Sequence, residues 1–177
     1  CDKHVVKMIV ESAQMLSTAH RMLDGIETRR RSKSGKTMSK YWELPDDRES
    51  VLYKAVHMGH PCTVWTMQND NNYRWHYEHF SALCKEYTHR YGKRHKSQEI
   101  IEWCMVNHPN IEEKGDLTEF RLAMPDECKI GDAVESYREY YNVFKKGFAK
   151  WKNRDIPYWF NPVNDSSEHL LETKRVS

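Results

Sequence analysis

The stretch CDKHVVKMIVESAQMLSTAHRML, residues 1–23, decides the fold of this chain. Its apolar side chains recur at helical spacing, so it predicts one long helix that is apolar around most of its circumference. The two apolar stripes consist of Val5, Ile9, Ala13, Leu16 and Leu23, and of Met8, Met15 and Met22. A helix with so little polar surface is buried on most sides. We expect Gly25 to end it in the left-handed conformation.

A narrow polar strip interrupts this apolar helix. It consists of His4, Lys7, Glu11 and Gln14, which share one side. Ionisable groups on a mostly buried helix cost free energy unless they are paired or used. An acid beside an amine and an imidazole supplies acid–base or amine chemistry. We therefore take Glu11, His4 and Lys7 as candidate catalytic residues lining a cleft, with a solvated polar face as the alternative.

Length and composition are those of one ordinary globular domain. The chain has 177 residues, of which 38% are hydrophobic and 31% are charged, and this is enough to bury a core. Five cysteines without a CxxC pair argue against a disulfide scaffold or zinc ribbon and favour the reducing cytoplasm. No apolar run approaches the ~18 residues of a membrane span, so we expect no membrane partner. We also expect the protein to be a monomer.

Positive charge is concentrated in three stretches, although the net charge is only +2. Residues 29–40 hold six cations and no acid, residues 90–96 hold four cations, and residues 138–154 hold six with one acid. Such segregation suits a polyanion such as nucleic acid, and solubility is the alternative. The candidate nucleic-acid contacts in these stretches are Arg29, Arg30, Arg31, Lys33, Arg138 and Tyr141.

The rest of the chain predicts helices joined by irregular segments. Helical spacing and capping residues place these helices at about 46–58, 61–65, 73–91, 97–107 and 131–152. Residues 26–45 are polar and basic, and we expect a long mobile loop that orders on a polyanion. No strand alternation is visible. The sequence therefore predicts an all-α fold, a single irregular bundle of about five helices in residues 1–160, followed by a flexible tail at 161–177.

Further candidates surround the junction at residues 60–65. His60 precedes Pro61 and is thereby held outside the helical region, where its ring suits an anion or a base. The amide, guanidinium and indole groups that follow can read and stack a nucleobase, and a capping turn is the alternative. The candidate nucleic-acid contacts of this region are His60, Trp65, Arg74 and Trp75.

Histidines are numerous, and two HxxH pairs stand out. His57 pairs with His60 and His76 pairs with His79, a spacing that can place two imidazoles on one metal ion. No third ligand stands out, so we assign no metal ligands. His20 falls on the core side of the first helix, and we expect a hydrogen-bonded structural residue there.

The opening motif resembles that of the bacteriophage pyrimidine-dimer DNA glycosylases of the endonuclease V kind. Asp2-Lys3-His4 followed by Glu11 is similar to that family's Asp-x-His with a catalytic glutamate seven residues after the histidine. Gly59-His60 and residues 137–141 resemble later segments of the family in the same order. The Cys-Asp-Lys-His opening and the Ala-Met-Pro-Asp-Glu segment also resemble uncharacterised phage-encoded proteins.

The resemblance implies an all-α glycosylase of the host cytoplasm that bends DNA and flips a nucleotide out of the stack. In that family an amine attacks the sugar C1′ and forms an imine, and Glu11 inherits the role of stabilising charge and moving protons. The family's reacting amine has no matching position here. Lys7, Lys3 and the α-amine of Cys1 therefore stay open as nucleophiles.

Three hypotheses result. The first is a cofactor-independent enzyme of DNA repair or modification that binds double-stranded DNA and acts on a flipped pyrimidine nucleotide, as a glycosylase/lyase or a related base-modifying enzyme. The second is a non-enzymatic helical nucleic-acid-binding module. The third is a metal-dependent helical hydrolase that uses the four histidines of the HxxH pairs.

Overall fold

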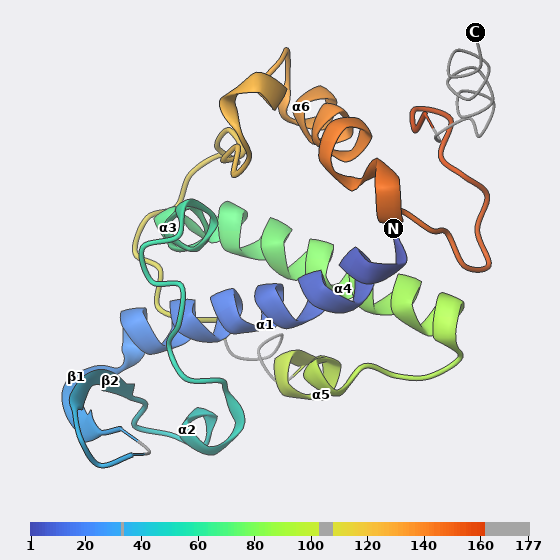
Figure 1. The fold of residues 1–177 in the computed structure, drawn as a ribbon. Coiled ribbons are helices and arrows are strands. Elements are labelled where there is room, and N and C mark those ends of the chain that lie inside the picture. Colours follow the sequence, from blue (N-terminus) through green and yellow to red (C-terminus); the bar gives the residue numbers. More distant parts are fainter. Residues whose placement is uncertain (33, 103–107, 162–177) are drawn as a thin grey trace, which may run out of the picture. The chain divides into compact units, whose positions relative to one another are not determined.

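The computed structural model describes residues 1–32, 34–102 and 108–161 (Figure 1). The chain divides into two units, Cys1–Ala123 and Met124–Ser177, and each is described by itself. Among the described residues the first unit holds five α-helices and a two-stranded antiparallel sheet, and the second holds one α-helix. The all-α prediction is wrong in this respect, because a β-hairpin accompanies the helices. The predicted tail lies, from residue 162 on, outside the described residues.

Two long helices, α1 (Asp2–Asp24) and α4 (Asp70–Tyr91), pack side by side in the first unit (Figure 1). Apolar and aromatic residues recur on one face of each helix, and burial of both faces removes apolar surface from water. The core residues are Val5, Ile9, Ala13, Leu16 and Ala19 of α1 and Tyr73, Tyr77, Phe80, Cys84 and Tyr87 of α4. Both predicted helices are confirmed. Helix α4 begins at Asp70, because the Asn69 side chain accepts a hydrogen bond from the Asn72 amide and caps it.

Two shorter helices, α3 (Pro61–Gln68) and α5 (Lys96–Glu102), pack against α1. The predicted helix at 61–65 is confirmed and runs one turn longer. The helix predicted at 97–107 is confirmed up to Glu102, and residues 103–107 lie outside the described residues. Residues 108–125 are irregular, as predicted, and a 3-10 turn follows at Asp126–Cys128.

The predicted basic loop is instead a β-hairpin of strands β1 (Ile26–Arg31) and β2 (Met38–Glu43). The strands are closed by a turn in which the Ser32 amide donates to the Thr37 carbonyl at 2.8 Å and Gly35 takes a positive φ of 70°. The stretch is rich in charged residues and lacks the alternation of apolar and polar residues that would predict strands. Lys33, a predicted DNA contact, lies outside the described residues.

Helix α2 (Arg48–Val51) is a single turn, much shorter than the helix predicted at 46–58. The chain then extends and crosses in front of α1 on its way to α3 (Figure 1). The carbonyl groups of this segment accept hydrogen bonds from α1 side chains and not from the next turn of a helix. The carbonyls of Leu52 and Tyr53 accept from Arg21, and the Val56 carbonyl oxygen lies 2.8 Å from the Thr18 hydroxyl. Tertiary hydrogen bonds therefore override the local helical preference.

The guanidinium of Arg21 is the polar centre of the first unit, and its side chain is 1% exposed. It donates five hydrogen bonds, to the carboxylate of Glu49 and to four carbonyls, those of Trp42, Glu49, Leu52 and Tyr53. Gly25 is extended, with φ −87° rather than left-handed as predicted. A Cβ at that position would collide with the Arg21 carbonyl oxygen, so close approach explains this glycine.

The second unit holds α6 (Ala133–Tyr140), whose first turn is capped by Asp132 accepting from the Glu135 amide at 2.9 Å. The prediction of a helix through residue 152 is wrong. The chain passes into a π turn at Tyr141–Lys145 and a 3-10 turn at Lys146–Phe148. The aromatic residues that follow pack on one another. For example, the ring centroids of Trp151 and Phe160 lie 5.5 Å apart.

Arg21→Met is expected to lower the free energy of unfolding by about 3–5 kcal/mol, because it leaves a carboxylate and four carbonyls without their donor. Urea denaturation measures this loss. The control is Arg29→Met on the exposed face of β1, which should change stability by no more than about 0.5 kcal/mol. Equal stability of the two variants would show that the buried guanidinium does not hold the fold together.

Candidate functional site

The polar strip of α1 lies at the surface over the first half of the helix. Lys7 Nζ lies 3.0 Å from Glu11 Oε1, and the two side chains are 67% and 32% exposed. His4 is half-buried one turn before Lys7. An amine, a carboxylate and an imidazole therefore share a solvent-facing side of α1, and the ion pair is not enclosed as the cleft hypothesis expects.

The second half of α1 is covered by the segment between α2 and α3. The Val56 amide donates to the Thr18 hydroxyl at 3.0 Å, and the Tyr53 amide donates to the Ser17 hydroxyl at 3.3 Å. This segment thus crosses α1 beyond the polar strip, at Ser17 and Thr18 (Figure 1).

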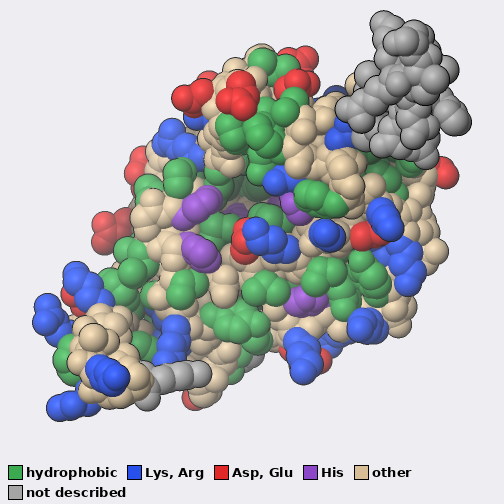
Figure 2. All heavy atoms as spheres, in the orientation of Figure 1, with side chains coloured by type: hydrophobic (Ala, Val, Ile, Leu, Met, Phe, Trp, Pro, Cys, Tyr) green, Lys and Arg blue, Asp and Glu red, His purple; other side chains and the backbone are tan. Residues whose placement is uncertain are grey.

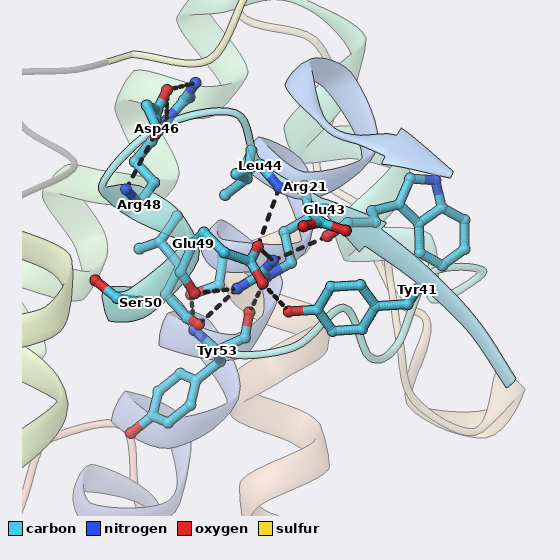
Figure 3. Close-up of polar contacts among 12 residues, drawn as sticks. Arg21, Tyr41, Glu43, Leu44, Asp46, Arg48, Glu49, Ser50 and Tyr53 are labelled. Atoms are coloured by element: carbon cyan, nitrogen blue, oxygen red, sulfur yellow. Dashed lines mark hydrogen bonds and ion pairs between the residues drawn. The ribbon is translucent and has the colours of Figure 1, made fainter. Parts of the chain in front are cut away.

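The base of the β-hairpin is fixed by Glu49 (Figure 3). Its carboxylate accepts hydrogen bonds from the Tyr41 hydroxyl, from the Leu44 amide at 3.0 Å and from Arg21 at 2.6 Å. Burial alone would raise the pKa of this carboxyl, but the three hydrogen bonds outweigh burial and lower the pKa to about 2. Glu49 is therefore ionised at neutral pH and holds β2 beside α1.

The consecutive arginines of β1 point to opposite faces of the hairpin, as neighbouring residues of a strand do. The Arg30 guanidinium lies 3.7 Å from the centroid of the Tyr41 ring and 3.5 Å from the Glu49 carboxylate, so it contacts the body of the unit although its side chain is 45% exposed. Arg29 and Arg31 are exposed and lie on the other face. Three residues that the sequence predicts as equivalent nucleic-acid contacts therefore lie on two different faces.

The candidate residues of α3 and α4 form an aromatic cluster. Trp65 is 4% exposed, and its ring centroid lies 5.7 Å from that of Trp75 and 5.4 Å from that of Phe120. Trp75 is half-buried and stacks on His79 at 5.1 Å. Arg74 is exposed beside this cluster. A buried Trp65 packs the interior, which leaves Trp75 and Arg74 as the surface candidates of this region.

The four histidines of the HxxH pairs are held in different ways. The ring centroids of His57 and His60 lie 6.3 Å apart, and His60 caps α3 by accepting from the Cys62 amide at 3.1 Å. His76 is buried with Nδ1 2.7 Å from the Thr66 hydroxyl. Within the ranges that the structure describes, no three His, Cys, Asp or Glu side chains are arranged to hold a metal ion. The hydrolase hypothesis therefore has no ligand set there.

His20 is fully buried between a cation and a phenol. Its Nδ1 lies 3.1 Å from an Arg48 nitrogen and its Nε2 lies 2.6 Å from the Tyr73 hydroxyl. Burial, helped by the charge of Arg48, lowers the pKa of His20 to about 3. His20 is thus a neutral, hydrogen-bonded structural residue, as its place on the core side of α1 indicates.

The candidates of the second unit belong to an aromatic and basic surface. The Arg138 guanidinium lies 5.5 Å from the ring centroid of Tyr158 and 5.7 Å from that of Trp159. The Tyr141 ring lies 5.8 Å from Trp159 and is half-buried. Tyr158 is 88% exposed, and sequence reasoning missed it. The signal was the run of three aromatic residues that follows Pro157.

Comparison with known proteins finds no match to this chain among family models, curated proteins or solved structures. Within the part of the chain that the structure describes, no helix combines the length and the apolar character needed to cross a bilayer.

His20 and His76 are expected to stay neutral well below pH 6.5, the usual pKa of a histidine. The main cause is burial, which lowers the pKa of each to about 3. NMR of the folded protein should show that neither imidazole titrates near 6.5. Below pH 6.5 the unfolded chain binds protons on these rings that the folded chain excludes. The free energy of unfolding should therefore fall by about 1.4 kcal/mol per pH unit for each histidine until about pH 3. Either ring titrating near 6.5 in the folded state would contradict the buried networks.

Proposed function

We propose that the protein is a DNA-binding enzyme that acts on a flipped pyrimidine nucleotide by glycosylase/lyase-like chemistry. The observation that carries this proposal is the pair formed by Lys7 Nζ and Glu11 Oε1, 3.0 Å apart on the open side of α1. The similarity of the Asp2-x-His4 and Glu11 spacing to the phage glycosylases supports the same assignment. Lys7 is preferred over Lys3 as nucleophile because of its contact with Glu11.

The pair supplies both groups that base excision through an imine requires. Glu11 accepts a proton from the Lys7 ammonium, and the neutral amine then attacks the sugar C1′. The bond between C1′ and the base breaks, and its electron pair leaves with the base, which takes up a proton. The attacking nitrogen then carries two protons; one of them passes to the ring oxygen as its bond to C1′ breaks, and the ring opens to a protonated imine between Nζ and C1′. Water then hydrolyses this imine and restores the amine.

A non-enzymatic nucleic-acid-binding module is the second candidate function. The exposure of Lys7, at 67%, and its i,i+4 spacing to Glu11 are those of a common surface ion pair, which contributes about 0.3–0.5 kcal/mol to a helix. Under this reading the exposed cations of the hairpin bind a polyanion, and the pair on α1 only stabilises the helix. The two candidates differ in whether a covalent adduct with DNA forms.

Glu11→Gln is expected to reduce turnover at least about 100-fold while DNA binding persists, because the amide cannot move the proton. Turnover is measured by borohydride trapping on duplexes that carry different pyrimidine lesions. Mass spectrometry of the adduct should place it on Lys7, and Lys7→Gln should abolish trapping.

The matched control is Asp126→Asn, which removes another surface carboxylate that pairs with a lysine, Lys129, at 2.6 Å. This variant should trap as much adduct as the wild type. An adduct on Lys3 would reassign the nucleophile. Salt-dependent DNA binding with no adduct on any duplex would favour the non-enzymatic module.

A further inference from the structure

Charge changes along the length of the β-hairpin. Its two acids, Glu27 and Glu43, both lie at the base, where they pair with Lys40 at 2.9 Å and with Arg30 at 3.1 Å. The segment from residue 28 to residue 42 contains no acid. Figure 2 shows Lys and Arg side chains crowding the lobe that the hairpin forms at the lower left. The far half of the hairpin is therefore a cationic projection.

Within that projection the positive charge is concentrated on one face. Arg29 lies directly opposite Lys40 in the register, and Arg31 lies two residues further along the same face, opposite Met38. All four of these side chains are exposed. Among the described residues neither Arg29 nor Arg31 has a carboxylate within ion-pair distance, and Lys40 is the only one of the three cations that has such a partner.

This arrangement costs stability in the free protein. Like charges directly opposite each other destabilise an antiparallel pair, and the pairing of Arg29 with Lys40 is of that kind. An anionic partner that lies along this face would convert the repulsion into attraction. The other face needs no such partner, because Arg30 contacts Tyr41 and Glu49 there.

The hairpin is also positioned before any partner binds. Trp42 of β2 accepts a hydrogen bond from Arg21 at 2.9 Å, and Tyr41 donates to Glu49, so the base is joined to α1 and α2 (Figure 3). A preorganised element loses less conformational entropy on binding than a loop does. A two-stranded ribbon of this kind has the width that the major groove of duplex DNA admits.

We propose that the outward face of the hairpin enters the major groove of duplex DNA, with Arg29, Arg31 and Lys40 contacting phosphates at its walls. This inference rests on the proposed function and assigns its duplex-binding element. Arg30 remains bound to the protein and takes no part. The three consecutive arginines therefore have alternating roles, which a disordered basic loop would not produce.

The test compares single alanine variants of Arg29, Arg30 and Arg31 in the full chain. Binding to a labelled, lesion-free duplex is followed by fluorescence anisotropy over a series of salt concentrations, and circular dichroism checks that each variant is folded. Arg29→Ala and Arg31→Ala should each weaken binding about tenfold at 0.1 M salt and reduce the slope of log K against log salt by about 0.9. Arg30→Ala should keep the wild-type slope.

The possible outcomes distinguish failure of this inference from failure of the proposed DNA-binding function. Wild-type binding to duplex with equal losses for all three variants, or with no loss for any, would overturn the groove-binding face and leave the DNA-binding proposal standing. Tighter binding to single-stranded DNA or to RNA than to the duplex would overturn the choice of partner. A wild-type protein that binds no duplex at all would remove both proposals.

Discussion

The buried cation of Arg21 holds the first unit together. The guanidinium of Arg21 is buried, and each of its five donor positions has an acceptor on the hairpin, on α2 or on the segment that follows α2. A buried charge is tolerated only when its hydrogen bonds are complete. These segments are consequently fixed to α1 by one side chain, although 21 to 32 residues of sequence separate them from it.

This constraint positions both regions that we connect with function. It keeps the hairpin at the C-terminal end of α1, where the strand pairing alone would leave it free to turn. It also holds the chain after α2 across the second half of α1, beyond the exposed pair of Lys7 and Glu11. The candidate reactive pair and the cationic ribbon thus lie on one framework, at different positions along the same helix.

The sequence predicts the elements whose signals are local and periodic. Helices α1 and α4 follow from the spacing of their apolar residues, and Asn69 and Gly92 act as the caps that such residues favour. The hairpin is missed because its buried residues, Tyr41 and Trp42, are adjacent and give no alternation. The single-turn α2 is missed because its end depends on acceptors for Arg21, which are distant in sequence. Likewise, Lys7 and Glu11 are paired by helix geometry, while their exposure depends on what covers α1.

The contact between Arg48 and His20 has a consequence for the direction of hydrogen bonding. A guanidinium has no acceptor, so Nδ1 of the imidazole must receive, and the ring proton must then reside on Nε2. That proton points at the phenol oxygen of Tyr73. The cation of Arg48 on α2 thereby selects one tautomer of His20 on α1. The Tyr73 hydroxyl on α4 then accepts the hydrogen bond of Nε2, so all hydrogen bonds in this chain of residues have the same direction.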